Sequence, residues 1–520
     1  MSVDRFRLET RMTRNAQAQD IIKARYSSLP PRWVAGTLVG CWPAFLLILH
    51  VALTGGAVSA PWMMGWIAVL SACALGSYAL TKSDGFDVQQ LELAGVLALA
   101  YPLFVMTGVP DVTQRHFGSA GADRLPLATV AAYACVLAGA RVVNTAGRAT
   151  RSRRVMKTSL IQRVVVALWI VAGFGVLGFY ISYAGTPPLV DLLNGTRGSA
   201  LAVARQNALV DLSNPLVAYA FNFVRLYFLP VASAALVVHW TRVRTLASGA
   251  AALGLLGVAL IAAALTLEKS PVMRLAVIVG LAFALGSGVR VRLGWSALVV
   301  FGSACFPLLV LSASNPGSSL GEVLRLFADR IFIDPARVIF FYLDWAPKDS
   351  GGFLGGRLLP FVGRHAGPSV PVTQIISSRI FPTATVQGNA NVAFLGSFWV
   401  DFGWWGVIFG SLFTGGALAC IQRVLDAMRG SVLGVAVAAL FVVQVAFLTL
   451  TSVFDSVLSV GFGVIDVLAL TYWWVRILGA TPPRTTAGRG RSISTESRWA
   501  GARPDVAAPS VIAPTSTDQP

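Results

Sequence analysis

Residues 248–267 read SGAAALGLLGVALIAAALTL and contain no charged side chain. A helix of about 20 apolar residues is long enough to cross the hydrocarbon core of a bilayer, so this stretch predicts a transmembrane helix. The short charged turn Glu268-Lys269-Ser270 follows it, and a second apolar run begins at Pro271. We therefore expect two membrane helices joined by a short polar turn.

The same pattern covers most of the chain. Its 520 residues are 55% hydrophobic and only 12% charged, whereas about a quarter of a soluble globular chain is charged. Twelve apolar runs lie at approximately 33–54, 61–81, 91–107, 126–146, 164–185, 215–240, 248–267, 271–288, 294–312, 391–420, 431–453 and 457–476. The sequence predicts an all-α, polytopic membrane protein with about 12 transmembrane helices and no separate soluble catalytic domain.

Basic residues set the predicted orientation. With the N-terminus placed inside, the inside segments carry 27 Lys and Arg, against 6 in the short outside connections. Cytoplasmic loops are the basic ones, so both termini are expected in the cytoplasm. This asymmetry accounts for the net charge of +18 and argues against a nucleic-acid partner. The predicted parts are a basic N-terminus (1–32), a polytopic domain (33–478) and a disordered cytoplasmic tail (479–520).

Two predicted outside segments are large enough to hold a site. The first, 185–214, contains a charged stretch at 191–211 that is compatible with an interfacial helix. The second, 313–390, is one large periplasmic or extracellular loop. Its run from Ile331 to Trp345 alternates apolar and charged residues at helical spacing and is rich in aromatics, which favours folded structure over disorder.

Common catalytic motifs are missing from the sequence. It has no phosphate-binding loop of the G-x-x-x-x-G-K-[ST] type, no H-E-x-x-H and no C-x-x-C. The five cysteines all fall in apolar segments, and the four histidines show no metal-ligand spacing. We expect neither a bound metal nor another cofactor.

Charged residues within or beside the spans are the main candidates for a site. Arg225 lies inside a predicted span, where a charge is costly unless it meets a partner, water or substrate; the alternative is snorkelling to the outer surface. Lys269 and Arg274 are candidates for binding a phosphate, with Glu268 as their salt-bridge partner or as a base. An ordinary charged turn explains these three residues equally well.

The outside segments supply further candidates. Arg197, Arg330 and Arg364 carry guanidinium groups that bind pyrophosphate bidentately, although a GC-rich genome would also favour arginine. His365 is the only histidine of the large loop and is a candidate base, although a lone loop histidine is more often a surface residue. Asp401, near the outer end of its span, is a candidate partner for an outer-loop arginine.

One stretch carries a family resemblance. Residues 396–406 read Gly-Ser-Phe-Trp-Val-Asp-Phe-Gly-Trp-Trp-Gly, after Gly-Gly-Phe-Leu-Gly-Gly-Arg-Leu-Leu-Pro at 351–360 and Ile-Phe-Pro-Thr at 380–383. Together with Thr-Leu-Glu-Lys-Ser-Pro at 266–271, these resemble the O-antigen (Wzy-type) repeat-unit polymerases. The resemblance covers the architecture of most of the chain and specific motifs over about a fifth of it. The arginine–glycine outer-loop motifs described for some family members are absent.

The resemblance implies a membrane glycosyltransferase with a GT-C-like fold. Such an enzyme polymerises undecaprenyl-diphosphate-linked oligosaccharides at the outer leaflet of the bacterial inner membrane, with inversion and without a metal. Arg225, Lys269, Arg274 and Arg364, chosen for their charge within or beside the membrane, are then the expected contacts of pyrophosphate or acceptor, with His365 or Glu268 as base. Membrane lipid, a flippase and a chain-length regulator are the implied partners. The alternatives are an O-antigen ligase, which also has an essential outer-loop arginine and histidine, and a transporter of lipid-linked sugar or polysaccharide.

Overall fold

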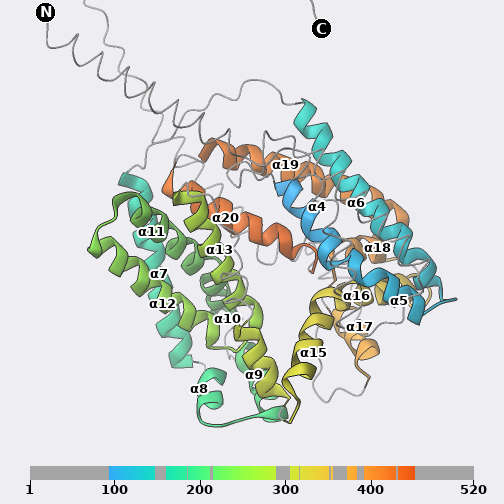
Figure 1. Ribbon diagram of the computed structural model, residues 1–520, viewed down its shortest axis with the longest axis horizontal. Coiled ribbons are helices and arrows are strands. Elements are labelled where there is room, and N and C mark those ends of the chain that lie inside the picture. Colours follow the sequence, from blue (N-terminus) through green and yellow to red (C-terminus); the bar gives the residue numbers. More distant parts are fainter. Residues whose placement is uncertain are drawn as a thin grey trace, which may run out of the picture. The chain divides into compact units, whose positions relative to one another are not determined.

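A computed structural model of the protein describes residues 93–146, 160–183, 185–210, 215–287, 305–315, 317–350, 353–354, 372–382, 390, 392–428 and 431–450. Every regular element in these ranges is a helix (Figure 1). The predicted spans at 33–54, 61–81 and 457–476 lie outside the described residues, as do the N-terminal segment 1–32 and the tail 479–520.

Seven helical stretches in the described ranges are long and apolar enough to cross a membrane. They are Leu93–Arg115, Ala120–Asn144, Val166–Tyr183, Leu216–Val243, Leu246–Ala264, Ser270–Ser287 and Phe394–Asp426. Each overlaps a predicted span, so the all-α, multi-pass character is confirmed for the described part of the chain, and the number of 12 spans stays a prediction. Two further predicted spans overlap shorter apolar helices, Cys305–Ser314 and Val432–Phe447.

The membrane helices are built from the following elements. They are α4 (Leu93–Phe104), α5 (Val109–Arg115), α6 (Ala120–Ala146), α7 (Leu160–Tyr183), α10 (Pro215–Phe223), α11 (Leu229–Val243), α12 (Leu246–Ala264), α13 (Lys269–Ser287), α18 (Phe394–Trp405), α19 (Ser411–Met428) and α20 (Val432–Phe447). A 3-10 turn, η2 (Met106–Gly108), joins α4 to α5, and two π turns, η3 (Val224–Phe228) and η4 (Gly406–Gly410), lead into α11 and α19.

The membrane helices pack in two groups. In one, α6 packs along α19, and a Cβ on Gly415 would lie 1.9 Å from the carbonyl oxygen of Val136, so only glycine permits this close approach. In the other, α11 packs against α12, α13 and α20, with α7 alongside. The outer faces of α7 and α12 expose apolar side chains such as Val171 and Leu253, which suits contact with lipid.

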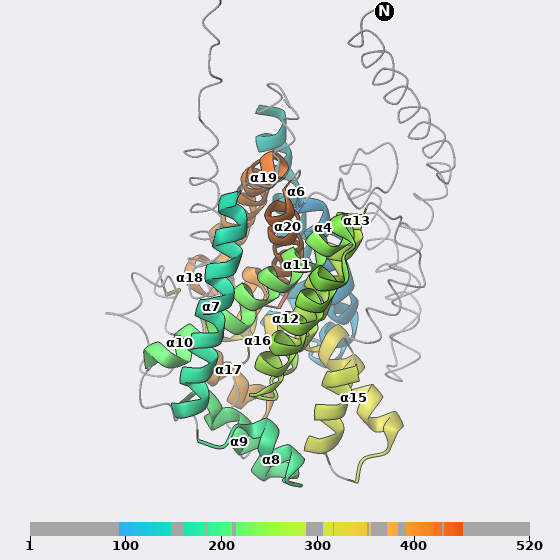
Figure 2. The same cartoon turned by 90° about the vertical axis from the view of Figure 1, so that its left-hand side faces the viewer.

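Both predicted outside segments contain helices. The first forms α8 (Pro188–Leu193) and α9 (Gly198–Val210), and the second forms α15 (Leu320–Phe332), α16 (Asp334–Trp345) and α17 (Val372–Ile380). In both views α8, α9 and α15 lie at one end of the membrane helices (Figures 1 and 2). The described part of the large loop is therefore folded, as its composition predicts.

The large loop is anchored on the membrane helices through α16. This helix buries most of its apolar side chains, among them Ile339 and Leu343, and packs on α6, α5 and α18. The preceding helix α15 begins at a capping box in which Ser319 and Glu322 satisfy each other's backbone N–H groups. The loop therefore belongs to the same core as the spans.

The motif at 396–406 forms a kinked helix that the loop covers. Within α18, Gly403 adopts φ 60° and ψ −138°, a conformation open to glycine and strained for other residues. The ring of Phe353 sits over it, where a Cβ on Gly403 would lie 2.6 Å from the nearest ring carbon. The Leu354 N–H donates to the Val400 carbonyl at 3.0 Å, and the Trp399 indole N–H donates to the Ala346 carbonyl at 3.0 Å.

We expect Gly403→Ala to destabilise the protein by about 1–3 kcal/mol, because the alanine meets both the strained dihedrals and the Phe353 ring. Thermal unfolding of the purified protein in detergent measures this effect. The matched control is Gly257→Ala, in a helix and facing open space, which we expect to be neutral or stabilising by up to about 1 kcal/mol. Equal unfolding temperatures for the two variants would contradict this account of the kink.

Candidate functional site

Arg225 lies in a widened turn of a membrane helix. It belongs to the π turn Val224–Phe228, between α10 and α11. Pro230 follows within the first turn of α11. Because proline has no N–H to donate to the Leu226 carbonyl, the regular helix is interrupted at this point. The Arg225 side chain is 1% exposed, so its charge is satisfied inside the protein.

Three side chains accept hydrogen bonds from the Arg225 guanidinium. Its Nε and Nη2 donate to Asn222 Oδ1 at 2.8 and 2.5 Å, Nη2 also donates to Glu268 Oε2 at 2.5 Å, and Nη1 donates to the Thr266 hydroxyl. The Phe221 ring centroid lies 5.3 Å from its Cζ. These bonds occupy most of the N–H donors of Arg225 and fix its guanidinium against Glu268.

A strained turn presents Thr266 and Glu268 to Arg225. Between α12 and α13, Leu267 has φ 53°, a left-handed conformation that is rare for a bulky residue. Its side chain is fully buried against Leu201 of α9 and Val310. The Leu189 N–H, at the start of α8, donates to the Leu265 carbonyl at 3.1 Å. The predicted polar turn is thus held in place by contacts with α8 and α9.

Arg205 of α9 approaches the same turn. It lies one helical turn after the buried Leu201, and the Tyr180 hydroxyl of α7 donates to the Ala208 carbonyl of α9 at 3.4 Å. Burial lowers the pKa of Arg205, the charge of Arg330 lowers it further, and Glu268 raises it. Within the described residues, the buried Arg205 Nε has no hydrogen-bond partner.

Arg274 approaches from α13. Its Cζ lies 4.0 Å from the centroid of the Phe447 ring of α20, and its side chain makes a hydrogen bond with Tyr227 of η3. The charges of Glu268 and Arg225 are close enough to act on it. Its Nε is also buried with no partner in the described part of the chain.

These residues form what we call the arginine cluster: Arg205, Arg225 and Arg274 around Glu268. Arg225 is ion-paired with Glu268, and the charge of Glu268 also acts on Arg205 and Arg274. The three cations and one carboxylate have a formal charge of +2. Arg330, exposed at the end of α15, lies at its edge, near both Arg205 and Asp334. The cluster can bind a dianion with fixed N–H donors.

The other predicted site residues lie elsewhere. Arg197 is exposed, and its Nη1 donates to the Leu192 and Thr196 carbonyls at 2.8 and 3.0 Å, so it stabilises the turn between α8 and α9. Asp401 is 2% exposed in α18, which packs on α16 and α6. Lys269 begins α13, and its side chain, like Arg364 and His365, lies outside the described residues.

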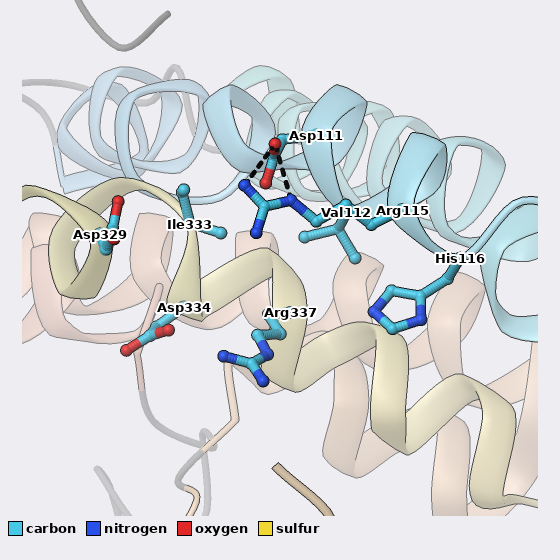
Figure 3. A pocket seen from close by; sticks show the side chains of 8 residues that line it. All are labelled: Asp111, Val112, Arg115, His116, Asp329, Ile333, Asp334 and Arg337. Carbon is cyan, nitrogen blue, oxygen red and sulfur yellow. Dashed lines mark hydrogen bonds and ion pairs between the residues drawn. The ribbon is translucent and has the colours of Figure 1, made fainter. Parts of the chain in front are cut away.

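A second polar site lies at the ends of α5 and α15, which we call the α5–α15 pocket. This pocket of about 300 Å³ is lined by Asp111, Val112, Arg115, His116, Asp329, Ile333, Asp334 and Arg337. Figure 3 shows Asp111 and Arg115 on one side and Asp334 and Arg337 on the other. Arg115 Nε and Nη2 donate to Asp111 Oδ1 at 3.0 and 2.9 Å. Sequence reasoning missed this pocket because its residues are more than 200 positions apart.

Two titrating groups of the α5–α15 pocket have shifted pKa values. Burial lowers the pKa of His116, Arg337 and Arg115 lower it further, and Asp344 and Asp111 raise it. The imidazole stacks on the Phe340 ring with centroids 4.3 Å apart. Burial raises the pKa of Asp334, against the charges of Arg330 and Arg337.

No protein-family model matches this chain, and comparisons with curated proteins and with solved structures find no significant match. Among the described residues, no group of three His, Cys, Asp or Glu side chains is placed to hold a metal ion.

We expect Glu268→Gln to destabilise the protein by about 1–3 kcal/mol, because it leaves the buried Arg225 charge without a carboxylate. The double variant with Arg225→Met should recover part of this loss, since neither charge remains. Unfolding temperatures of the two single variants and the double variant form a cycle that measures the coupling.

The control for this cycle is Asp349→Asn, which removes the carboxylate from a surface ion pair with Arg379 at 2.7 Å, with side chains 34% and 38% exposed. Such pairs contribute under about 1 kcal/mol. Additive effects of the Arg225 and Glu268 variants would show that the two residues are not coupled.

The pKa of His116 predicts a pH dependence of stability. Because it is lowered from 6.5, the folded state binds fewer protons than the unfolded state near pH 6, and stability rises with pH until the unfolded imidazole is also neutral. The unfolding temperature of the wild type minus that of His116→Gln should therefore increase from about pH 5 to about pH 7. A difference that is constant over this range would contradict the assignment.

Proposed function

We propose that the protein is a membrane glycosyltransferase that polymerises undecaprenyl-diphosphate-linked oligosaccharide repeat units into a surface polysaccharide. The arginine cluster is the observation that carries this proposal. A diphosphate that joins a lipid to a sugar is a diester with two negative charges, which matches the formal charge of the cluster. The Nε–H groups of Arg205 and Arg274 are buried and have no hydrogen-bond partner among the described residues, so they are suitable donors for its oxygens.

The position of the cluster supports a substrate that lies in the membrane. Arg225 and Arg274 belong to helices long and apolar enough to cross it, whereas Arg205 and Arg330 come from the two predicted outside segments. An undecaprenyl-linked diphosphate has its polyprenyl chain in the bilayer and its charged group at the surface. The three predicted outside connections that meet at the cluster are 185–214, the turn at 268–270 and 313–390. Their meeting there fits entry of the lipid-linked substrate from the outer leaflet.

The proposed reaction requires no nucleotide sugar. A hydroxyl oxygen of the acceptor attacks C1 of the donor sugar, and the bond from C1 to the phosphate oxygen breaks with its electron pair remaining on the phosphate. The proton of the hydroxyl passes to a base, for which Glu268 and His365 are the candidates. Arg205 and Arg274 stabilise the charge on the departing diphosphate, and Arg225 holds Glu268 in place.

The remaining features of the proposal come from the family resemblance and from the charge pattern of the sequence. Lys269, Arg330 and Arg364 are further candidates for diphosphate contacts, and the reaction is inverting and independent of a metal. The protein would act in the bacterial inner membrane with both termini in the cytoplasm, beside a flippase and a chain-length regulator. The resemblance of residues 396–406 to the polymerase family supports the same assignment.

The direct test incubates the purified full-length protein, reconstituted in lipid, with a lipid-linked repeat unit and EDTA, without nucleotide sugar. We expect a ladder of polymer lengths on a gel. Arg274→Gln should lower the rate about 100-fold or more, because it removes fixed donors from the leaving diphosphate. The control is Arg244→Gln, which should leave the rate unchanged. Arg244 is exposed at the C-terminal end of α11, whereas the cluster residue Arg225 lies just before the N-terminal end of that helix.

Other products would replace the proposal with its alternatives. Transfer of a single preformed chain to a lipid A acceptor would indicate a ligase. Movement of the lipid-linked sugar across vesicles without a new glycosidic bond would indicate a transporter. A full ladder from the folded Arg274→Gln variant would remove the arginine cluster from the mechanism.

A further inference from the structure

The α5–α15 pocket contains buried hydrogen-bond acceptors to which no donor in the described ranges is bonded. Asp111 is 5% exposed, and both of its bonds from Arg115 go to Oδ1. Its Oδ2 is buried, as is Asp329 Oδ1 on the opposite side, and neither has a hydrogen-bond partner among the described residues. Buried carboxylate oxygens without donors are costly, so this pocket favours a ligand with O–H or N–H groups.

Hydrogen-bond donors face the same space. Arg337 lines the pocket from α16, opposite Asp111 and Arg115 (Figure 3). Its Nη2 donates to the Ile380 carbonyl at 3.2 Å. A ligand that fits this arrangement both donates to the aspartates and accepts from the arginine. A sugar hydroxyl group does both.

Charge and size narrow the class of ligand. Two arginines and three aspartates line the α5–α15 pocket, so their formal charges nearly cancel and an anion has no net attraction there. This distinguishes it from the arginine cluster, whose formal charge is +2. A volume of about 300 Å³ is at the lower end of the range for small-molecule sites and is sufficient for one monosaccharide.

We infer that the α5–α15 pocket binds one neutral sugar residue of a saccharide substrate through Asp111, Asp329 and Arg337. Arg330 follows the pocket residue Asp329 on α15, and its charge acts on both Asp334 and Arg205. The pocket then selects the sugar while the cluster binds the diphosphate. The inference deepens the proposed function and rests on it for the identity of the whole substrate, but sugar binding is measurable without any transfer.

The test uses full-length protein in lipid nanodiscs and a panel of methyl glycosides of neutral hexoses and N-acetylhexosamines, observed by saturation-transfer NMR. We expect saturable binding of at least one glycoside to the wild type. Asp329→Asn and Arg337→Gln should each weaken that binding about tenfold, the effect of losing one charged hydrogen bond. Asp123→Asn, an exposed aspartate in the first turn of α6, is the matched control and should bind like the wild type.

Thermal unfolding of each variant separates loss of binding from loss of folding. The inference is wrong if no glycoside binds saturably, or if binding is unchanged in both folded pocket variants. Arg274→Gln distinguishes it from the proposed function: this variant should lose polymerisation and keep glycoside binding. If the wild type binds a glycoside but makes no glycosidic bond, the pocket is a sugar site and the proposed polymerase function is wrong. If both pocket variants polymerise as fast as the wild type, the pocket does not bind a sugar of the substrate.

Discussion

The burial of Arg225 in a membrane helix is the constraint on which the site depends. A guanidinium with 1% exposure in an apolar helix must be compensated within the protein. The compensation comes from Thr266 and Glu268, in a turn whose left-handed Leu267 is held by α9. The ion pair therefore links α10 and α11 to the turn between α12 and α13, and that turn positions α9 and Arg205.

Excess positive charge distinguishes this arrangement from an ordinary structural ion pair. A single arginine would be satisfied by Glu268 alone, yet Arg205 and Arg274 also approach that carboxylate. Three like charges repel one another, so holding them together at the end of membrane helices costs stability. The proposed anionic ligand would offset this cost, and the α5–α15 pocket would add hydrogen-bonding groups suited to the neutral part of the same molecule.

The helices could be predicted from the sequence more fully than the site. Hydropathy is a local property, so residues 248–267 predict α12 to within a few positions, and the aromatic run from Ile331 predicts α16. The sequence also singled out Arg225, Glu268, Arg274 and Arg330. The sequence could not show that Arg205 joins these residues and Arg197 does not, because the position of Arg205 depends on the packing of Leu201 against Leu267. The amphipathic spacing of Leu201 and Arg205, one turn apart, was the available signal. The kink at Gly403 and the α5–α15 pocket likewise arise from contacts between distant segments.

The most direct measurement is an experimental structure of the full-length protein in lipid with undecaprenyl diphosphate. We predict density for the diphosphate within hydrogen-bond distance of the Arg205 and Arg274 guanidinium groups, with Arg225 still bound to Glu268 and the lipid chain leaving along the membrane helices. Density for the diphosphate at another place on the protein, with Arg205 and Arg274 unchanged and not in contact with it, would contradict the account.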